Sequence, residues 1–220
     1  MLTNATAELA LALTLAAARR TSELEAELRA GRWSGWDPGG YLGTELSGAT
    51  FVVAGLGRIG HRYAELVRPL AGLLLYTARS PKPELADPLD AEFAELPEAI
   101  AAADVLSLHV PGGADTQGMI GATELAAMKP TAILVNTARG SLVDSAALAA
   151  ALASGEIAAA GLDVFPNEPA VPAELLAAPN AVLLPHVGSA TTKARDAMAR
   201  TVARNVLAVL EGREPHDRVA

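Results

Sequence analysis

The sequence has no cysteine, few aromatic residues and no excess of positive charge. Without cysteine there are no disulfides and no thiolate metal ligands, which fits a reducing cytoplasm. Seventeen basic residues against twenty-five acidic ones give a formal charge of -8, so we expect no nucleic-acid partner and no anionic membrane surface. No stretch approaches the roughly 20 apolar residues of a membrane span. Residues 9–18 are apolar, but the charges of Arg19 and Arg20 follow them, the reverse of a secretory signal.

Alanine, leucine and valine supply most of the apolar fraction, which suits helices packed on a parallel sheet. From residue 49 onward, short apolar runs alternate with helical stretches, which predicts right-handed crossovers. We therefore expect an α/β fold, a Rossmann-type doubly wound parallel sheet flanked by helices. The expected strands are TFVVAG, GLLLYT, DVLSLHV, TAILVNT, AAAGLDV and AVLLP. The helices expected between them are residues 60–69, 97–102 and 145–153.

Three further segments lie outside this alternation. Residues 4–20 predict a buried helix, because their apolar positions occupy more than one face. Residues 21–32 predict a second, polar helix, and residues 32–48 are glycine-rich and irregular. Residues 190–211 predict a long amphipathic helix that leaves the sheet.

The sequence GLGRIG at residues 55–60 directly follows an expected strand and opens a helix, the context in which this pattern binds a dinucleotide. Gly55 permits the tight turn, Gly57 lets a pyrophosphate approach the backbone, and Gly60 lets helix and strand pack closely. The helix N-terminus adds amide donors and partial positive charge. The alternative, a glycine turn without a ligand, is disfavoured by this context.

The end of the second expected strand indicates which dinucleotide binds. An NAD enzyme places a carboxylate there for the ribose hydroxyls. This chain has Thr77 at the strand end, and Arg79, Ser80 and Lys82 follow, all able to contact a 2′-phosphate. We expect a preference for NADPH, with NAD as a possible second cofactor. Alternatively, Arg79 and Lys82 only solvate a loop.

Arg139, Glu168 and His186 each follow a different expected strand, so they converge on the carboxyl edge where ligands of such sheets bind. Reducing a 2-oxo acid requires a cation for the carboxylate, which Arg139 provides, and an acid for the carbonyl oxygen, which His186 provides. Glu168 would orient the imidazole and favour its protonated form. Each residue alone has a structural alternative, but together they indicate catalysis.

The other histidines, His61, His109 and His216, have no such support. We expect His61 and His109 to be structural, because no acid partner is evident for either; the alternative is a place near the cofactor. No HExxH pattern or comparable ligand cluster occurs, so we expect no metal site.

These motifs together resemble the D-2-hydroxyacid dehydrogenases, and within them the glyoxylate/hydroxypyruvate reductase branch. The resemblance covers nearly the whole chain and is carried by TNATAELALAL, GLGRIG, LHVP, ILVNTARGSLVD, ASGEIAAAGLDVFPNEP and LLPHVGSAT. YTARSPKPE and WSGW resemble the glyoxylate/hydroxypyruvate branch in particular.

The resemblance implies that Arg139 binds the substrate, that His186 donates the proton and that Glu168 tunes the histidine. It places Asp163 near the nicotinamide carboxamide. Further implied cofactor contacts, some through the backbone, are Arg58, Ile59, Pro111, Thr116, Thr137 and Gly188.

The resemblance also implies a homodimer formed by the first helices and the WSGW arm, with Trp36 reaching toward the partner's substrate pocket. Local packing of the two tryptophans is the alternative. We expect a dinucleotide-binding domain over residues 1–188, with helices and dimer arm at about 1–48, and a remnant of a substrate-binding domain over residues 189–220.

In members of this family, most of a substrate-binding domain, of the order of 100 residues, lies before the segment that corresponds to TNATAEL. We therefore expect a fragment or shortened gene model, or else a stand-alone nucleotide-binding and dimerisation module. The expected function is reduction of glyoxylate or hydroxypyruvate by NADPH in the parent enzyme, with cofactor binding but little turnover in the 220 residues alone. A non-catalytic dinucleotide sensor or corepressor is the alternative. The preferred substrate and the physiological direction stay open.

Overall fold

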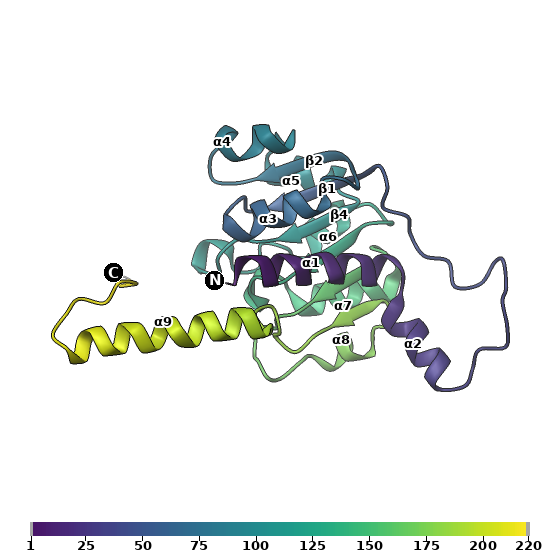
Figure 1. Ribbon diagram of the computed structural model, residues 1–220. Helices are drawn as coiled ribbons and strands as arrows, with labels where there is room; N and C mark the ends of the chain where they lie inside the picture. The colour runs from purple at the N-terminus through teal and green to yellow at the C-terminus, as the bar shows by residue number, and fades with distance from the viewer. Residues whose placement is uncertain (1, 219–220) are drawn as a thin grey trace.

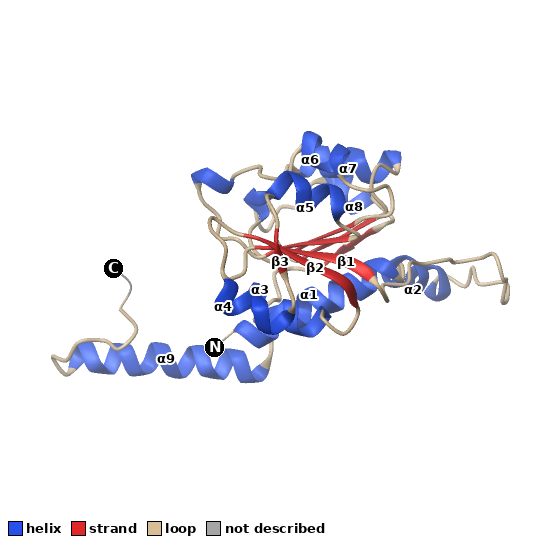
Figure 2. Cartoon of the chain, turned by 90° about the horizontal axis from the view of Figure 1, so that it is seen from above, coloured by secondary structure: helices blue, strands red, loops and turns tan. Residues whose placement is uncertain are grey.

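The computed structural model describes residues 2–218, and they form a seven-stranded parallel sheet between two layers of helices (Figures 1 and 2). The strand order is β3-β2-β1-β4-β5-β6-β7, so the chain winds outward in both directions from β1 and β4. This is the Rossmann-type doubly wound sheet that the sequence predicts. The strands are β1 (Ala49–Ala54), β2 (Ala71–Thr77), β3 (Glu92–Phe93), β4 (Val105–Leu108), β5 (Ile133–Asn136), β6 (Ala159–Leu162) and β7 (Ala181–Leu183).

Alternate residues of each central strand enter different cores, because successive side chains point to opposite faces of a sheet. In β1, Phe51 and Val53 pack in one hydrophobic cluster, whereas Val52 and Ala54 pack in the other. Figure 2 shows α5, α6, α7 and α8 on one face, and α1, α3 and α4 on the other. Both faces are covered, which explains why the strands are apolar throughout.

The helices that follow strands are mostly short. Their bounds are α3 (Arg58–Val67), α4 (Pro83–Ala86), α5 (Leu96–Ala102), α6 (Ala122–Ala127), α7 (Ser145–Ser154) and α8 (Ala173–Ala177). The predicted helices correspond to α3, α5 and α7, although α3 begins at Arg58 rather than near Gly60. Helices α4, α6 and α8 and strand β3 were not predicted, because two to six residues are too few to show a period.

Helix α1 (Thr3–Ala18) crosses the sheet as the predicted buried helix, with Ala7, Ala10 and Leu13 in the core. A Cβ on Gly161 of β6 would lie 2.9 Å from the Leu13 Cβ, so the small residue permits this close crossing. Helix α2 (Thr21–Arg29) buries none of its residues and ends three residues earlier than predicted.

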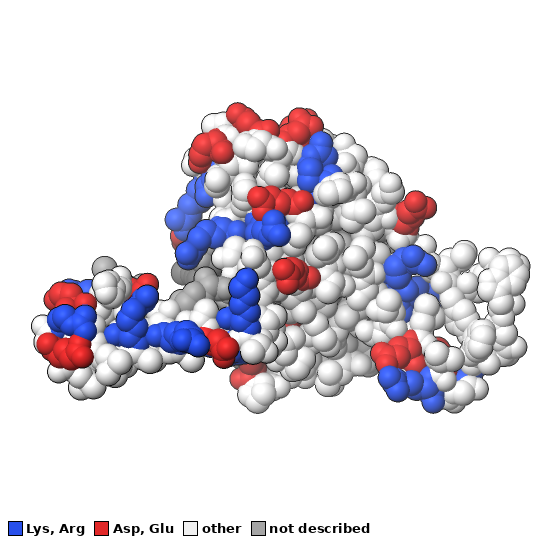
Figure 3. All heavy atoms as spheres, in the orientation of Figure 1, with Lys and Arg blue, Asp and Glu red and all other residues white. Residues whose placement is uncertain are grey.

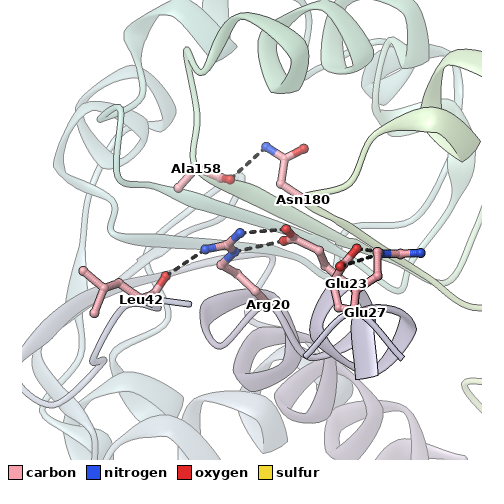
Figure 4. A network of polar contacts seen from close by, with 7 residues as sticks. Arg20, Glu23, Glu27, Leu42, Ala158 and Asn180 are labelled. Carbon is pink, nitrogen blue, oxygen red and sulfur yellow. Dashed lines mark hydrogen bonds and ion pairs between the residues drawn. The ribbon is translucent and has the colours of Figure 1, made fainter. Parts of the chain in front are cut away.

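Residues 32–48 form an arm that extends from the body beside α2 (Figure 1). Arg20 contacts the arm at Leu42, because its guanidinium donates to the Leu42 carbonyl at 3.3 Å (Figure 4). The same guanidinium pairs with both oxygens of Glu23 in α2. Arg32 at the arm's beginning pairs in turn with Glu27 at 2.7 Å. Arg20, which precedes α2, and Glu27 within α2 therefore fix the arm at Leu42 and at Arg32.

Helix α9 (Thr192–Leu210) projects away from the sheet, as the sequence predicts (Figure 1). Thr191 caps its first turn by accepting from the Ala194 amide at 3.2 Å. Ala194 and Ala208 are its buried residues. Among residues 2–218, neither α9 nor any other helix combines the length and apolarity needed to span a bilayer.

Candidate functional site

The glycine loop between β1 and α3 gives each of its three glycines a different surrounding. Gly55 has φ +100°, and a Cβ there would lie 2.9 Å from the His109 carbonyl oxygen. A Cβ on Gly60 would lie 2.0 Å from the Gly55 carbonyl oxygen, so only glycine lets the helix approach the strand. A Cβ on Gly57 would meet no atom within 4 Å, which leaves its backbone open to a ligand. The surroundings of Gly55 and Gly60 are those that the sequence predicts, and at Gly57 the structure shows the open space that a pyrophosphate would need.

The loop lies where the strand order reverses. β1 pairs with β2 on one side and with β4 on the other, and ligands of doubly wound sheets bind at this position. Arg58 opens α3, so the helix directs its free amides toward the carboxyl edge of the sheet. Arg58 is exposed, whereas Ile59 is half-buried against the core around α1 and α3.

The loop after β2 carries Arg79, Ser80 and Lys82. The Lys82 Nζ donates to the Leu56 carbonyl at 3.2 Å, and the Lys82 amide donates to the buried Tyr76 hydroxyl at 2.7 Å. Lys82 therefore links this loop to the glycine loop. Arg79 and Ser80 are exposed, and the Arg79 guanidinium lies 3.8 Å from the Asp115 carboxylate.

A cavity of about 520 Å³ adjoins Lys82 and the glycine loop. Basic side chains supply much of its wall, and Figure 3 shows Lys and Arg side chains gathered over the beginning of α3. Its lining residues are Thr3, Leu56, Gly57, Arg58, His61, Arg62, Glu65, Lys82 and Leu85. The sequence did not single out Arg62, whose guanidinium pairs with Glu65 at 2.8 Å.

The loop after β4 contains Pro111 and Thr116. The Thr116 hydroxyl donates to the Pro111 carbonyl at 2.8 Å and to the Gly113 carbonyl at 3.3 Å, which closes the loop on itself. The His109 amide donates to Ala54 at 2.7 Å, so this loop is fixed against the end of β1.

The end of β5 presents Thr137 and Arg139. The Thr137 hydroxyl is buried and has no hydrogen-bond partner within residues 2–218. Asn136, which the sequence did not single out, accepts from the Ala138 amide at 3.0 Å and donates to the Arg139 carbonyl at 2.9 Å. Its buried amide thereby sets the turn that presents Arg139. The Arg139 side chain is exposed, and its Nη1 donates to Ala138 at 2.6 Å.

Asp163 follows β6 and is almost fully buried. Its two oxygens accept from the amides of Val187 and Gly188, each at 2.8 Å. Burial raises the pKa of Asp163 above its ordinary value, although these two hydrogen bonds oppose the shift. The Gly188 carbonyl accepts from the Thr6 hydroxyl at 3.1 Å. Asp163 therefore holds the segment after His186 in place.

Glu168 and His186 are in direct contact, with 2.6 Å between Glu168 Oε2 and His186 Nδ1. Glu168 Oε1 accepts from the Phe165 amide at 2.9 Å, so both carboxylate oxygens are engaged. The hydrogen bond from His186 holds the pKa of Glu168 below its ordinary value, and the charge of Arg139 lowers it further. His186 has φ +53°, a conformation uncommon outside glycine, which orients its ring at this edge.

The structure therefore brings two of the three predicted catalytic residues together and places the third nearby. Strands β5, β6 and β7 are neighbours, so the residues that follow them meet at one edge. Glu168 contacts His186 directly. Arg139 makes no such contact, but its positive charge lowers the pKa of Glu168. A cation, an imidazole and a carboxylate at one edge can bind an acid anion and deliver a proton.

The other histidines differ among themselves. His109 is partly buried, with its Nε2 2.9 Å from the Ser107 hydroxyl and its ring 5.0 Å from that of Tyr63. Its Nδ1 is buried and has no hydrogen-bond partner within residues 2–218. Burial lowers the pKa of His109 to about 3. The expectation that His61 has no acid partner is wrong, because its Nδ1 lies 3.9 Å from Glu65, one helical turn later. His216 is exposed beyond α9.

The model of the NAD-binding domain of D-isomer specific 2-hydroxyacid dehydrogenases matches residues 11–188, which contain the glycine loop and the Glu168–His186 pair. The chain belongs to this family. It is 45% identical to the glyoxylate reductase of Thermococcus litoralis, over 100% of this chain and 67% of that relative. This dehydrogenase chain thus spans about two thirds of the length of the curated relatives that it matches.

Solved structures agree with this assignment. A protein from Thermus thermophilus superimposes with a TM-score of 0.93 at 47% identity, covering 100% of this chain and 69% of that one. The NADPH-dependent glyoxylate/hydroxypyruvate reductase of Sinorhizobium meliloti, solved with NADP and malonate, gives a TM-score of 0.89 at 40% identity. There the coverage is 100% of this chain and 68% of the other. The predicted family and its reductase branch are confirmed.

Proposed function

We propose that the chain carries the cofactor site and the catalytic residues of a reductase that converts glyoxylate or hydroxypyruvate to the 2-hydroxy acid with NADPH. The observation that carries this proposal is the 2.6 Å contact between Glu168 and His186, at the sheet edge that also holds the glycine loop. The names of the Thermococcus litoralis and Sinorhizobium meliloti relatives support the substrate class.

His186 is the proposed proton donor. Because Glu168 engages Nδ1, the other ring nitrogen, Nε2, remains to protonate the substrate carbonyl oxygen. Glu168 orients the ring and balances its positive charge, and the Phe165 amide fixes the carboxylate in turn. Arg139 binds the substrate carboxylate, for which a planar guanidinium offers paired donors.

The residues along the carboxyl edge fit a nicotinamide dinucleotide, which supplies the hydride when bound. The open space at Gly57 admits a pyrophosphate, and the orphaned buried hydroxyl of Thr137 offers a donor for a ligand group. The proposed contacts are Gly55, Gly57, Arg58, Ile59, Gly60, Arg79, Ser80, Lys82, Pro111, Thr116, Thr137, Asp163 and Gly188.

NADPH is the proposed cofactor rather than NADH, because residues 77–82 include no carboxylate that would repel a 2′-phosphate. Lys82, held against the glycine loop, and Arg79 provide positive charge at this position. The Sinorhizobium meliloti relative is described as NADPH-dependent, which agrees with this proposal.

A chimera tests the reaction. In the glyoxylate reductase of Thermococcus litoralis, the matching stretch is replaced by this 220-residue chain, and reduction of glyoxylate and of hydroxypyruvate is measured with NADPH and NADH. We expect reduction of both substrates, at higher kcat/KM with NADPH. A folded chimera that binds NADPH but reduces neither substrate would contradict the proposal.

A homodimer formed through α2 and the arm is also proposed. Trp36 in the arm is 84% exposed, and Leu42 is exposed as well, whereas Trp33 lines an apolar hollow with Leu28 and Tyr41. Large exposed apolar side chains on an extended arm are typical of an interface. Light scattering should give the mass of two chains, and Trp36→Ala should shift it toward one.

Residues 189–220 are proposed to belong to a substrate-binding domain rather than to the sheet domain. In support, α9 projects away from the sheet and exposes Val202, Val206, Leu207, Val209 and Leu210. Limited proteolysis tests this proposal, because we expect a protease to cleave the isolated chain near residue 189. Equal resistance to the protease along the whole chain would contradict it.

A further inference from the structure

The carboxylate of Asp115 faces Arg79, and the proposed cofactor site assigns no role to this acidic side chain. Arg79 lies in the loop after β2, and Asp115 lies in a short 3-10 turn, Ala114–Thr116, after β4. Strand β1 separates β2 from β4 in the sheet, so the 3.8 Å contact between these side chains joins the loops on either side of the glycine loop.

The two side chains differ from the ion pairs that stabilise the body. Their exposed fractions are 88% and 87%, so water screens the pair and its bond is weak. The backbone beneath Asp115 is nevertheless held, because the Thr116 hydroxyl donates to the Pro111 carbonyl at 2.8 Å. The carboxylate is therefore kept near Arg79 without being locked to it.

Another acid near the same basic residues already has a partner. Glu65 pairs with Arg62 at 2.8 Å on its own helix, so its charge is balanced within α3. Asp115 has no basic neighbour of this kind in its own loop, and the side chain that it faces is Arg79.

We propose that Asp115 is a specificity-determining residue, which competes with the 2′-phosphate of NADPH for Arg79 and so narrows the preference for NADPH over NADH. The inference rests on the proposed use of NADPH. The 2′-phosphate dianion binds the Arg79 guanidinium through paired hydrogen bonds, so the contact between Arg79 and Asp115 must break when NADPH binds. NADH carries no 2′-phosphate and leaves the contact intact.

Asp115→Asn tests the inference in the 220-residue chain. Fluorescence titration at low salt should show NADPH binding about two- to fivefold more tightly, the range expected for an exposed pair, while NADH changes by less than about twofold. At about 0.5 M salt the gain should shrink, because exposed charges are then screened over a few ångströms.

Two further variants identify the cause. Asp115→Asn in an Arg79→Ala background should give no gain, because the contested group is absent. The matched control is Asp90→Asn, which removes the same charge from an exposed carboxylate paired with Arg68 at 2.9 Å, near the opposite end of β2. It should leave both affinities unchanged.

The outcomes separate the inference from the proposed function. If Arg79→Ala weakens NADPH binding but Asp115→Asn does not strengthen it, the inference is wrong and the NADPH preference stands. An equal gain for NADPH and NADH, or a gain that persists without Arg79, also overturns the inference. If Arg79→Ala leaves NADPH binding unchanged, both the inference and the proposed role of Arg79 fail.

Discussion

The carboxyl edge of the sheet has two ends that are built differently. At the end formed by β5, β6 and β7, the contacts are short and both oxygens of Glu168 and of Asp163 are engaged. At the end formed by β1 and β2, Arg79 is highly exposed and its contact with Asp115 is 3.8 Å long. We call these the catalytic end and the adenosine end.

The difference follows from what each end is proposed to do. Proton transfer requires donor and acceptor to be held within hydrogen-bond distance, so the catalytic end is fixed by neighbouring backbone amides. Discrimination between NADPH and NADH needs only a modest difference in binding free energy, which exposed charged side chains can provide. We therefore expect large effects of substitution at the catalytic end and small, salt-dependent effects at the adenosine end.

The largest effect is expected for His186→Ala in the chimera. Loss of the proton donor should lower kcat by about 10²- to 10⁴-fold, while the Kd for NADPH changes by less than about twofold. Steady-state kinetics and cofactor titration on one preparation measure both. His216→Ala, at an exposed histidine beyond α9, is the matched control. Equal loss of kcat and cofactor binding would show that His186 supports the fold rather than the reaction.

The glycine loop joins the two ends, and two of its glycines should respond in opposite ways. Gly60→Ala places a Cβ 2.0 Å from the Gly55 carbonyl, so the free energy of unfolding should fall by about 1–3 kcal/mol. Gly57→Ala meets no atom within 4 Å, so stability should be kept while the Kd for NADPH rises at least about tenfold.

Urea unfolding and cofactor titration of both glycine variants distinguish a structural glycine from a ligand-contacting one. If Gly57→Ala binds NADPH as tightly as the unchanged chain, the pyrophosphate does not approach the loop there, and the proposed cofactor pose is wrong.

His109 underlies the glycine loop, and its burial makes stability depend on pH. Its pKa is about 3 in the folded chain and about 6.5 when unfolded, so unfolding takes up a proton below pH 6.5. Neutral His109 contributes fully to the free energy of unfolding above pH 6.5, and this contribution is lost as the pH falls from 6.5 toward 3. Between pH 7 and pH 5 this amounts to about 2 kcal/mol.

Urea unfolding at the two pH values measures this loss. His109→Gln keeps a polar group near Ser107 but does not titrate, so its stability should change much less between pH 7 and pH 5. An unchanged pH dependence in His109→Gln would mean that another group is responsible.

The smallest of these effects belongs to the adenosine end. Lys82→Ala removes a charged donor beside the glycine loop, and the Kd for NADPH should rise about tenfold, with a smaller change for NADH. Lys193→Ala, at an exposed lysine of α9, should change neither affinity. Equal weakening of both cofactors would assign Lys82 to the glycine loop rather than to the 2′-phosphate.

The sequence predicts the parts of this arrangement that depend on local pattern. The GLGRIG loop, the strands on both sides of it and the polar residues after β5, β6 and β7 all follow from short apolar runs and what comes next. Gly55 and Gly60 have the surroundings that their positions in the pattern require.

The remainder depends on contacts between distant segments. Nothing in the sequence pairs Asp115 with Arg79, or directs Asp163 to the amides of Val187 and Gly188. Asn136 could have been noticed as a polar residue ending a buried run, which often indicates a side chain that caps a turn. Strand β3 contains only Glu92 and Phe93, too few residues to show alternation.

A crystal structure of the chain with NADPH tests the central claim most directly. We predict the pyrophosphate at Gly57, the 2′-phosphate beside Lys82 and Arg79, and the nicotinamide ring at the catalytic end beside His186. A cofactor bound with its nicotinamide away from the Glu168–His186 pair would contradict the account.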